Sequence, residues 1–142
     1  MFVGQFDHNI DDKGRLTIPA TYRDSLSNGV YISLGLEQNL IIWSSEAFSK
    51  LYHRLEEMRY TDKTGRNFGR FVFANAVSLE LDKAGRILIP QFLREKVGLD
   101  GLVKLTGSGN YIEVWKPENF EKNQAEFMDG EKRAEYFQDL DI

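Results

Sequence analysis

The hydrophobic and polar positions of this chain alternate over short stretches, and this alternation predicts β-strands. Residues 2–10 alternate, and residues 77–81 repeat the pattern in the second half of the chain. After a polar turn, each stretch is followed by a second short strand, at 15–18 or 86–89. Alternation there turns one set of side chains inward and leaves the other on the opposite face. The inward set is Leu16, Ile18, Ile87 and Ile89, and the outward set is Arg15, Thr17, Arg86 and Leu88.

Prolines and glycines mark two short helices that follow these strands. Pro19 and Pro90 stand at the first-turn position of a helix, where a missing N–H is tolerated. Each helix is expected to end about two turns later, at Asn28-Gly29 in the first half and at Gly98 in the second. Loop residues then separate two further strands in each half, at 30–34 and 40–43, and at 102–106 and 111–115.

A longer helix closes each half. In the first half, apolar side chains recur at helical spacing from Phe48 to Met58, behind a serine cap at Ser44 or Ser45. In the second half, Pro117 opens the corresponding helix. These helices are expected to flank the strands of each half.

The segments outside this regular pattern are a connection and a tail. Residues 60–66 have the composition of a linker, and residues 67–76 are expected to form a helix that leads into the second half. Residues 66–73 mix arginines with aromatic side chains, which could stack on bases, but their helical spacing favours core or subunit contacts. Beyond Asp129 the polar tail is expected to be a loose helix or disordered.

Two nine-residue stretches, 11–19 and 82–90, carry the same motif. In each stretch an Asp stands four residues before an Arg, and a Gly directly precedes that Arg. Three aliphatic or β-branched residues then lead to a Pro. The two stretches are 71 residues apart, and one inserted residue later Trp43 aligns with Trp115. The chain is therefore interpreted as a tandem duplication.

The duplication predicts the domain organisation and the fold class. The expected halves are 1–64 and 65–130, followed by an acidic tail at 131–142. A unit of about 70 residues is marginally stable alone, so the two copies are expected to interleave around one core. The predicted fold is a small, β-rich α/β protein with one pseudo-two-fold, barrel-like unit flanked by helices.

The motif residues are those that a tight turn needs. Gly14 and Gly85, directly before the returning strand, suit a backbone with positive φ. Asp11 and Asp82 could pair with the guanidinium four residues on, or accept hydrogen bonds from N–H groups of the turn. We therefore expect these two aspartates to orient the turn rather than to contact a ligand. Good turn-forming residues alone would explain the motif up to this point.

The arginines and lysines of the motif exceed what a turn requires. Lys13 with Arg15, and Lys83 with Arg86, place basic side chains at the two tips. From a β-ribbon in the major groove they could contact phosphates or a guanine edge of DNA. The Lys is the third residue of the first motif but the second residue of the other, so the two lysines need not be equivalent.

One further pair of arginines is matched between the copies. Arg23 and Arg94 lie on the short proline-led helices, where an arginine is usually solvated or paired with an acid. A secondary contact with DNA is the alternative function for this pair.

The charge of the chain is unevenly distributed. The formal net charge is −4, but residues 117–142 alone carry eight acidic and three basic side chains, which leaves residues 1–116 at +1. Bulk charge therefore neither favours nor excludes nucleic-acid binding, and the local placement of charge must decide. The chain has no cysteine, which excludes disulfides and thiolate metal sites, and no apolar run long enough to span a membrane. We expect a soluble, cytosolic protein with no membrane partner.

An enzymatic function has little support in the sequence. His8 and His53 lack metal-ligand spacing, and the glycines of 107–109 are too few for a phosphate loop. Asp11 and Asp82 could form a symmetric carboxylate dyad, but such a dyad needs a buried cleft rather than polar tips. We predict no catalytic residue, no metal and no cofactor.

The two motifs, the Met-Phe-x-Gly start, the proline-led helices and the pair Trp43 and Trp115 together resemble the MraZ family, over residues 1 to about 128. The resemblance implies two tandem halves of the SpoVT/AbrB swapped-hairpin type that form a double-psi-like β-barrel with flanking helices. It also implies a cytoplasmic, nucleoid-associated transcriptional regulator without cofactors. Such a regulator would bind short direct repeats in double-stranded DNA upstream of the division and cell-wall gene cluster. Its expected assembly is a ring-shaped homo-oligomer, an octamer or dodecamer.

A second function from a different class remains open. Some antitoxin-like proteins of the same AbrB fold suggest a protein-interaction scaffold without specific DNA readout. In that case the acidic tail would be the contact with a partner protein. A partner that binds the tail, in the absence of any shift of DNA, would favour this function.

Overall fold

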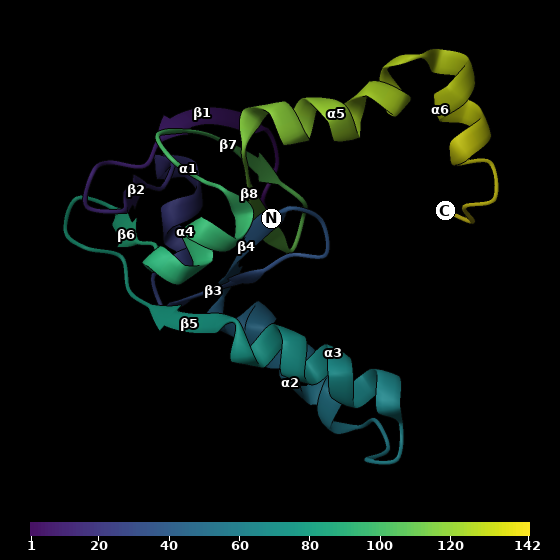
Figure 1. The fold of residues 1–142 in the computed structure, drawn as a ribbon, viewed down its shortest axis with the longest axis horizontal. Coiled ribbons are helices and arrows are strands. Elements are labelled where there is room, and N and C mark those ends of the chain that lie inside the picture. The colour runs from purple at the N-terminus through teal and green to yellow at the C-terminus, as the bar shows by residue number, and fades with distance from the viewer.

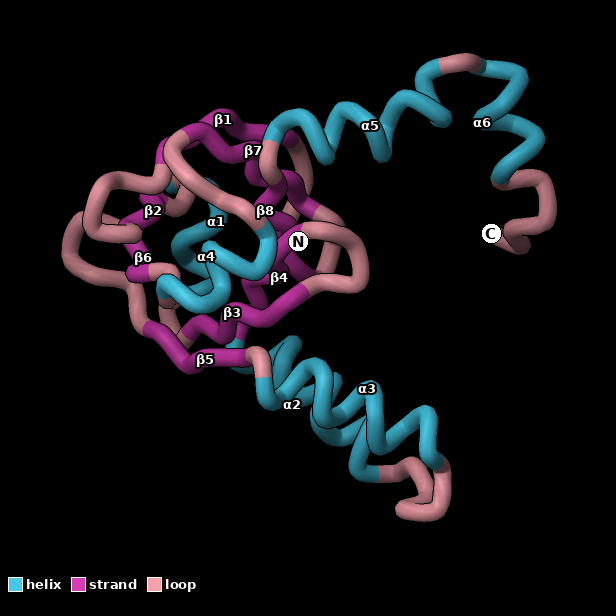
Figure 2. The backbone as a smooth tube through the Cα atoms, viewed as in Figure 1, coloured by secondary structure: helices cyan, strands magenta, loops and turns pink.

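The computed structural model of the chain describes residues 1–142 and confirms the mixed, β-rich α/β fold with interleaved halves (Figures 1 and 2). Eight strands, six α-helices and one short 3-10 helix follow one another along the chain. The strands are β1 (Gln5–Asn9), β2 (Arg15–Thr17), β3 (Val30–Leu34), β4 (Asn39–Ser44), β5 (Ala76–Leu79), β6 (Arg86–Leu88), β7 (Leu102–Gly107) and β8 (Tyr111–Trp115). The helices are α1 (Ala20–Arg23), η1 (Asp24–Leu26), α2 (Ser45–Glu56), α3 (Lys63–Ala74), α4 (Gln91–Val97), α5 (Pro117–Met128) and α6 (Gly130–Tyr136).

The two halves exchange their first strands in a six-stranded antiparallel sheet with the order β1-β7-β8-β4-β3-β5. Strand β1 of the first half pairs with β7 of the second, and β5 of the second half pairs with β3 of the first. The order reads as equivalent strands from either end, so an approximate two-fold axis passes between β8 and β4. This exchange is what the sequence predicted as interleaving.

A separate ribbon of two short strands, β2 and β6, contains one strand from each half. In its antiparallel register, Arg15 lies opposite Leu88 and Thr17 lies opposite Arg86. Two hydrogen bonds extend this pairing into the turns of the opposite half. The amide of Ile18 donates to the carbonyl of Gly85 at 2.9 Å, and the amide of Ile89 donates to that of Gly14 at 2.9 Å.

One apolar core lies inside the barrel and draws on both halves. It comprises 19 buried residues, and the strand and short-helix positions of the two repeats contribute matched members. The four side chains predicted to face inward are at most 1% exposed, whereas Leu88 on the other face is 56% exposed. The inward and outward faces of β2 and β6 are therefore confirmed.

The first strand is shorter than the alternation of residues 2–10 suggested. Gly4 has a positive φ of 94°, which interrupts the extended backbone before β1 begins at Gln5. Phe2 and Ile10 each form only an isolated bridge, to Gly109 and Leu16 respectively. Both side chains are nevertheless buried in the core.

Two helical arms leave the barrel (Figure 1). Helices α2 and α3 form a hairpin in which Phe73 packs edge-on against Phe48 and Tyr52. The predicted linker at 60–66 is wrong in its second part, because α3 begins at Lys63. Asp62 caps this helix by accepting a hydrogen bond from the amide of Gly65 at 3.1 Å, so the helix begins before its apolar positions do. The expected boundary between residues 64 and 65 lies in the first turn of α3.

The second arm consists of α5 and α6 and carries the acidic end of the chain. Its residues from 130 to 136 are helical, so the tail contains the helix that the sequence left as an alternative to disorder. The ring of Phe127 contacts the rings of Tyr136 and Phe137, and these contacts hold α6 against α5. None of the helices of the chain has both the length and the apolar character needed to cross a membrane.

Candidate nucleic-acid interface

The first turn is organised by Asp11. One carboxylate oxygen accepts hydrogen bonds from the backbone amides of Lys13 at 3.0 Å and Arg15 at 2.8 Å. The other oxygen accepts a hydrogen bond from Nε of Arg15 at 2.7 Å. Between Lys13 and Arg15, Gly14 takes a φ of 87°, a backbone conformation that residues with a side chain rarely adopt. The aspartate therefore shapes the turn and holds the arginine that leaves it.

The second turn repeats this geometry. Asp82 accepts hydrogen bonds from the amides of Ala84 and Arg86, both at 2.9 Å, and from Nε of Arg86 at 2.8 Å. Gly85 takes a φ of 76°. Two turns with different residues between Asp and Gly thus hold their arginines in the same way.

Both aspartates are stabilised in their ionised form. The backbone amide of Arg15 lowers the pKa of Asp11 below its ordinary value of 3.8, and partial desolvation opposes this effect. The pKa of Asp82 is lowered for the same reason by the amide of Arg86. In both cases the guanidinium contributes further, through its hydrogen bond and its charge. At neutral pH each of these two carboxylates is therefore ionised and hydrogen-bonded within its own turn.

The outward face of the β2–β6 ribbon presents the two arginines. The side chains of Arg15 and Arg86 are 33% and 34% exposed, and their terminal nitrogens make no hydrogen bond within the chain. Lys13 and Lys83 are exposed in the adjoining turns. Figure 1 shows both turns at one end of the barrel, on the side away from the two helical arms. The structure thus brings the four basic residues predicted from the motif to one end of the molecule.

Arg23 and Arg94 are not on an open helix surface. Nε of Arg94 donates to the carbonyl of Ile89 at 3.0 Å, and Nε of Arg23 donates to the carbonyl of Ile18 at 2.8 Å. Neither arginine has a carboxylate within salt-bridge distance, so neither forms the ion pair with an acidic side chain that is common for an arginine on a helix. Each guanidinium instead lies against the turn of the opposite repeat, over Gly14 for Arg94 and over Gly85 for Arg23.

Sequence reasoning missed this crossing. Nothing in the spacing of Arg94 indicates that its partner turn is 80 residues away, because the crossing follows from the strand exchange.

Titratable side chains elsewhere in the fold are dispersed. No group of three or more His, Asp or Glu side chains gathers closely enough to hold a metal ion. His53 stacks on Tyr52 and lies 3.4 Å from Glu56 on the same helix. Asp11 and Asp82 each bind their own turn, so they do not have the arrangement that a shared-proton dyad requires.

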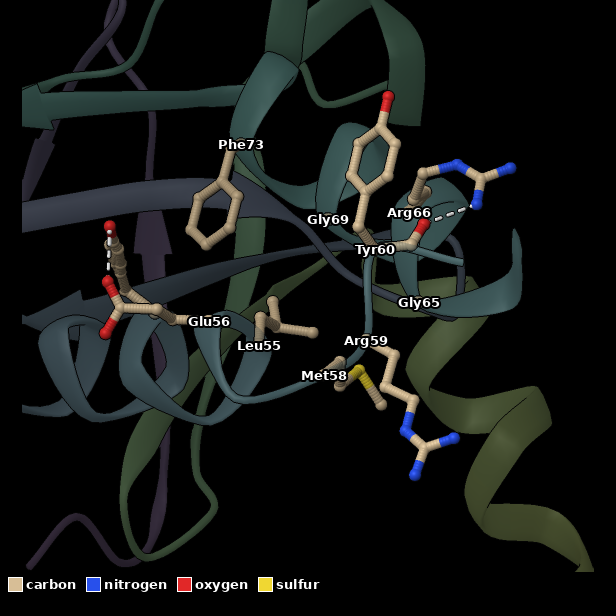
Figure 3. A pocket seen from close by; sticks show the side chains of 10 residues that line it. Leu55, Glu56, Met58, Arg59, Tyr60, Gly65, Arg66, Gly69 and Phe73 are labelled. Atoms are coloured by element: carbon tan, nitrogen blue, oxygen red, sulfur yellow. Dashed lines mark hydrogen bonds between the residues drawn. The ribbon is translucent and has the colours of Figure 1, made fainter. Parts of the chain in front are cut away.

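A hollow of about 590 Å³ lies far from the turns, between α2 and α3 at the distal end of the helical hairpin. Figure 3 shows Phe73 and Leu55 on its apolar side, with Arg66 turned back to the carbonyl of Tyr60 at 2.6 Å. The guanidinium of Arg66 also lies over the ring of Tyr60, at 5.5 Å from the centroid. The polar groups of this hollow thus mainly bind one another. Arg66 thus binds within the hairpin, whereas Phe68 and Phe71 border a second hollow between α3 and the sheet, as the helical spacing favoured.

Comparison with known proteins identifies the family. The family model described as "MraZ protein, putative antitoxin-like" matches twice, at residues 1–71 and 72–139. A transcriptional regulator MraZ from Acetivibrio thermocellus is 41% identical over 136 residues, which cover 95% of each chain. Those from Oenococcus oeni and Caldicellulosiruptor saccharolyticus are 36% and 38% identical over 143 residues and match over 100% of both chains.

One solved structure is a distant match. The solution structure of PHS018 from Pyrococcus horikoshii has a TM-score of 0.34 and 15% identity, over 80% of this chain and 88% of that chain. This likeness is too weak to support an argument. The two family-model matches and the full-length relatives are sufficient on their own: the chain belongs to the MraZ family of transcriptional regulators.

Proposed function

We propose that this protein regulates transcription by binding double-stranded DNA through the β2–β6 ribbon and its two turns. The contacting residues are Lys13 and Arg15 from the first half and Lys83 and Arg86 from the second. The observation that carries the proposal is that two arginines, each held by its own aspartate, stand on one outward face. A turn alone would not require them.

The ribbon is a two-stranded antiparallel pair, an architecture that can read the major groove of DNA. A two-stranded β-ribbon fits into the major groove of B-DNA, where arginine bonds the O6 and N7 atoms of guanine with two N–H groups. Because Asp11 and Asp82 occupy only the Nε atoms, the terminal nitrogens of Arg15 and Arg86 remain available for this contact. The lysines would contact phosphates, at positions that differ between the two tips.

The proposed DNA targets are short direct repeats upstream of the division and cell-wall gene cluster, and the proposed location is the nucleoid in the cytoplasm. The resemblance to the family supports both proposals. Direct repeats suit an assembly whose subunits are related by rotation, because each subunit presents its tips in the same sense. Avidity across the assembly would then make several repeats bind far more tightly than one.

The proposed assembly is a ring-shaped homo-oligomer, an octamer or dodecamer. The arm of α5 and α6 supports it, since this arm projects from the barrel (Figure 1) and leaves Met128 and Tyr136 exposed. Heterologous contacts of this arm with a neighbouring chain would close into a ring. Light scattering at micromolar protein concentration tests the assembly, and a monomer would contradict it.

The DNA contacts are tested by replacing the arginines singly. Arg15→Ala and Arg86→Ala are each expected to weaken binding about 5- to 150-fold, since each removes one two-pronged contact. Each should also relax the sequence preference at the contacted base pair, because the lost contact is to a base edge. The probe is a duplex obtained by selecting bound sequences from random DNA, and the readout is fluorescence anisotropy at several salt concentrations.

Arg54→Ala is the matched control, because Arg54 is an exposed arginine on α2 that makes no salt bridge and lies on an arm away from the turns. This variant removes the same charge and should bind normally. Normal binding by Arg15→Ala and Arg86→Ala, with unchanged sequence preference, would overturn the proposed interface.

The alternative function, a protein-interaction scaffold, is favoured by the exposed apolar side chains of the acidic arm. It predicts that selection from random DNA enriches no sequence, while a protein partner is retained by the intact chain. The same partner should be lost when residues 129–142 are removed. Enrichment of one DNA motif, with binding that the arginine variants weaken, would exclude this alternative as the main function.

A further inference from the structure

Arg94 and Arg23 each lie over a turn of the opposite repeat. A Cβ atom built on Gly14 would sit 2.9 Å from a terminal nitrogen of Arg94 and 3.0 Å from its Cζ atom. Arg23 lies closer still over Gly85. Glycine is thus needed at both positions for two reasons, the positive φ and the guanidinium that occupies the place of a side chain.

Both guanidinium groups are anchored at one end and free at the other. Each uses Nε for a backbone carbonyl, that of Ile89 for Arg94 and that of Ile18 for Arg23. The four remaining N–H groups of each guanidinium make no hydrogen bond within the chain, and no carboxylate lies within salt-bridge distance. Arg15 and Arg86, in contrast, are each paired with an aspartate. The crossing arginines are therefore the cations at the tips whose charge is not neutralised by a partner, apart from the lysines.

Formal charge shows what the crossing changes. Residues 11–15 contain two acids and two bases, so the first turn by itself has no net charge. Residues 82–86 contain one acid and two bases, a net charge of +1. With the crossing arginine added, the first tip becomes +1 and the second +2. Since attraction to phosphate depends on net positive charge, the first tip becomes cationic only through Arg94.

We propose that each DNA-contacting tip is a composite of both repeats. Arg94 of the second repeat is the third basic residue of the first tip, with Lys13 and Arg15, and Arg23 of the first repeat has that place in the second tip. The free N–H groups of each crossing guanidinium donate to a DNA phosphate, while its Nε bond to a carbonyl of its own repeat anchors the guanidinium over the turn of the other repeat. This inference rests on the proposed function, because it assigns further contacts at the same tips.

A double-mutant cycle on DNA affinity distinguishes composite tips from separate repeats. Arg94→Ala is expected to weaken binding about 5- to 100-fold and to couple with Arg15→Ala, so that the double variant binds about 2- to 100-fold more tightly than the product of the single effects requires. Arg94→Ala with Arg86→Ala should be multiplicative, although these two residues belong to the same repeat. The reciprocal pattern, with Arg23 coupled to Arg86, is expected for the second tip.

The salt dependence separates contact from support. Loss of a phosphate contact in Arg94→Ala should make the slope of log affinity against log salt shallower by about one, and a purely structural arginine would leave this slope unchanged. Arg94→Lys keeps the charge without the Nε anchor, and it should retain the wild-type slope with a smaller loss of affinity. If Arg94→Ala does not fold, the lysine variant still gives the coupling with Arg15→Ala.

The outcomes for the inference and for the proposed function differ. Coupling of Arg94 with Arg86 rather than Arg15, or wild-type affinity and slope for Arg94→Ala, would overturn the composite tip while the interface stands. If Arg15→Ala and Arg86→Ala themselves leave binding unchanged, the proposed function fails, and the composite tip with it.

Discussion

At the scale of single residues, each aspartate of the repeated motif determines where one arginine points. Asp11 uses one oxygen for two backbone amides and the other for the guanidinium of Arg15, so the turn and the side chain are held by the same carboxylate. This geometry cancels part of the positive charge that the arginine brings. The aspartate thus orients the arginine but lowers the net positive charge of the turn. For this reason an additional unpaired cation near the tip matters.

The carboxylate of Asp11 should make stability depend on pH. Because its pKa is lower in the folded chain than its ordinary 3.8, its contribution is fully present above about pH 4 and is lost as the pH falls through the folded value. Asp11→Asn should therefore unfold at a lower temperature than the wild type at pH 7, and the difference should shrink between pH 4 and pH 2. Thermal unfolding followed by circular dichroism across this range is the measurement.

Asp12→Asn is the matched control for this prediction, since the neighbouring Asp12 is exposed and accepts no hydrogen bond in the structure. Its unfolding temperature should follow the wild type at every pH. A constant difference between Asp11→Asn and the wild type from pH 7 to pH 2 would contradict the assigned role of the carboxylate.

At the scale of secondary-structure elements, glycines act in opposite ways according to backbone conformation. Gly98 ends α4 with a φ of 66°, and its amide bonds the carbonyls of Arg94 and Glu95. Gly69 lies in the interior of α3 without a positive φ. Neither position has an atom within 4 Å of the place that a Cβ would take. The two sites therefore differ in conformation and not in available space.

We expect alanine to have opposite effects on stability at these two glycines. Gly98→Ala should lower the free energy of unfolding by roughly 1 kcal/mol, because a left-handed conformation disfavours a side chain. Gly69→Ala should raise it by about 0.5–1 kcal/mol, because glycine in a helix interior loses more backbone entropy on folding. Urea denaturation of the two variants beside the wild type measures both effects. Shifts of the same sign would show that space, rather than conformation, governs these sites.

At the scale of the whole molecule, the two repeats depend on each other for their strand pairing. Strands β1 and β2 of the first half have β7 and β6 of the second as their partners, and the core is shared. Neither half contains the partners that its own first strands need. A half alone would expose unpaired backbone groups and part of the apolar core to water.

Residues 1–74 expressed alone are therefore not expected to fold as a monomer. The fragment should give an unfolded circular dichroism spectrum at concentrations where the whole chain is folded. Light scattering on the same samples shows whether any folded fraction is a dimer, in which a second copy supplies the missing strands. A folded monomeric fragment would contradict the mutual dependence of the halves.

The residue pattern by itself determined the local features of this protein. Alternation separated the inward and outward faces of β2 and β6, the Asp and Gly positions predicted the turns, and the repeat predicted equivalent halves. These features depend on contacts between residues close in sequence, or on which side chains avoid water. Both kinds of dependence produce recognisable patterns in the amino-acid sequence. The motif likewise indicated Lys13, Arg15, Lys83 and Arg86 as candidates, whose contact with DNA stays a prediction.

Only the tertiary structure decided which strands pair and what lies over each turn. In a duplicated sequence, β1 meets an equally suitable hydrophobic pattern in β3 of its own half and in β7 of the other, so local preference cannot choose between them. Closing one shared core makes the choice, because the exchange buries both inward faces at once. That same exchange carries Arg94 over Gly14 and Arg23 over Gly85. Residues close in sequence therefore form each turn, whereas the net charge of each tip includes an arginine from the other repeat.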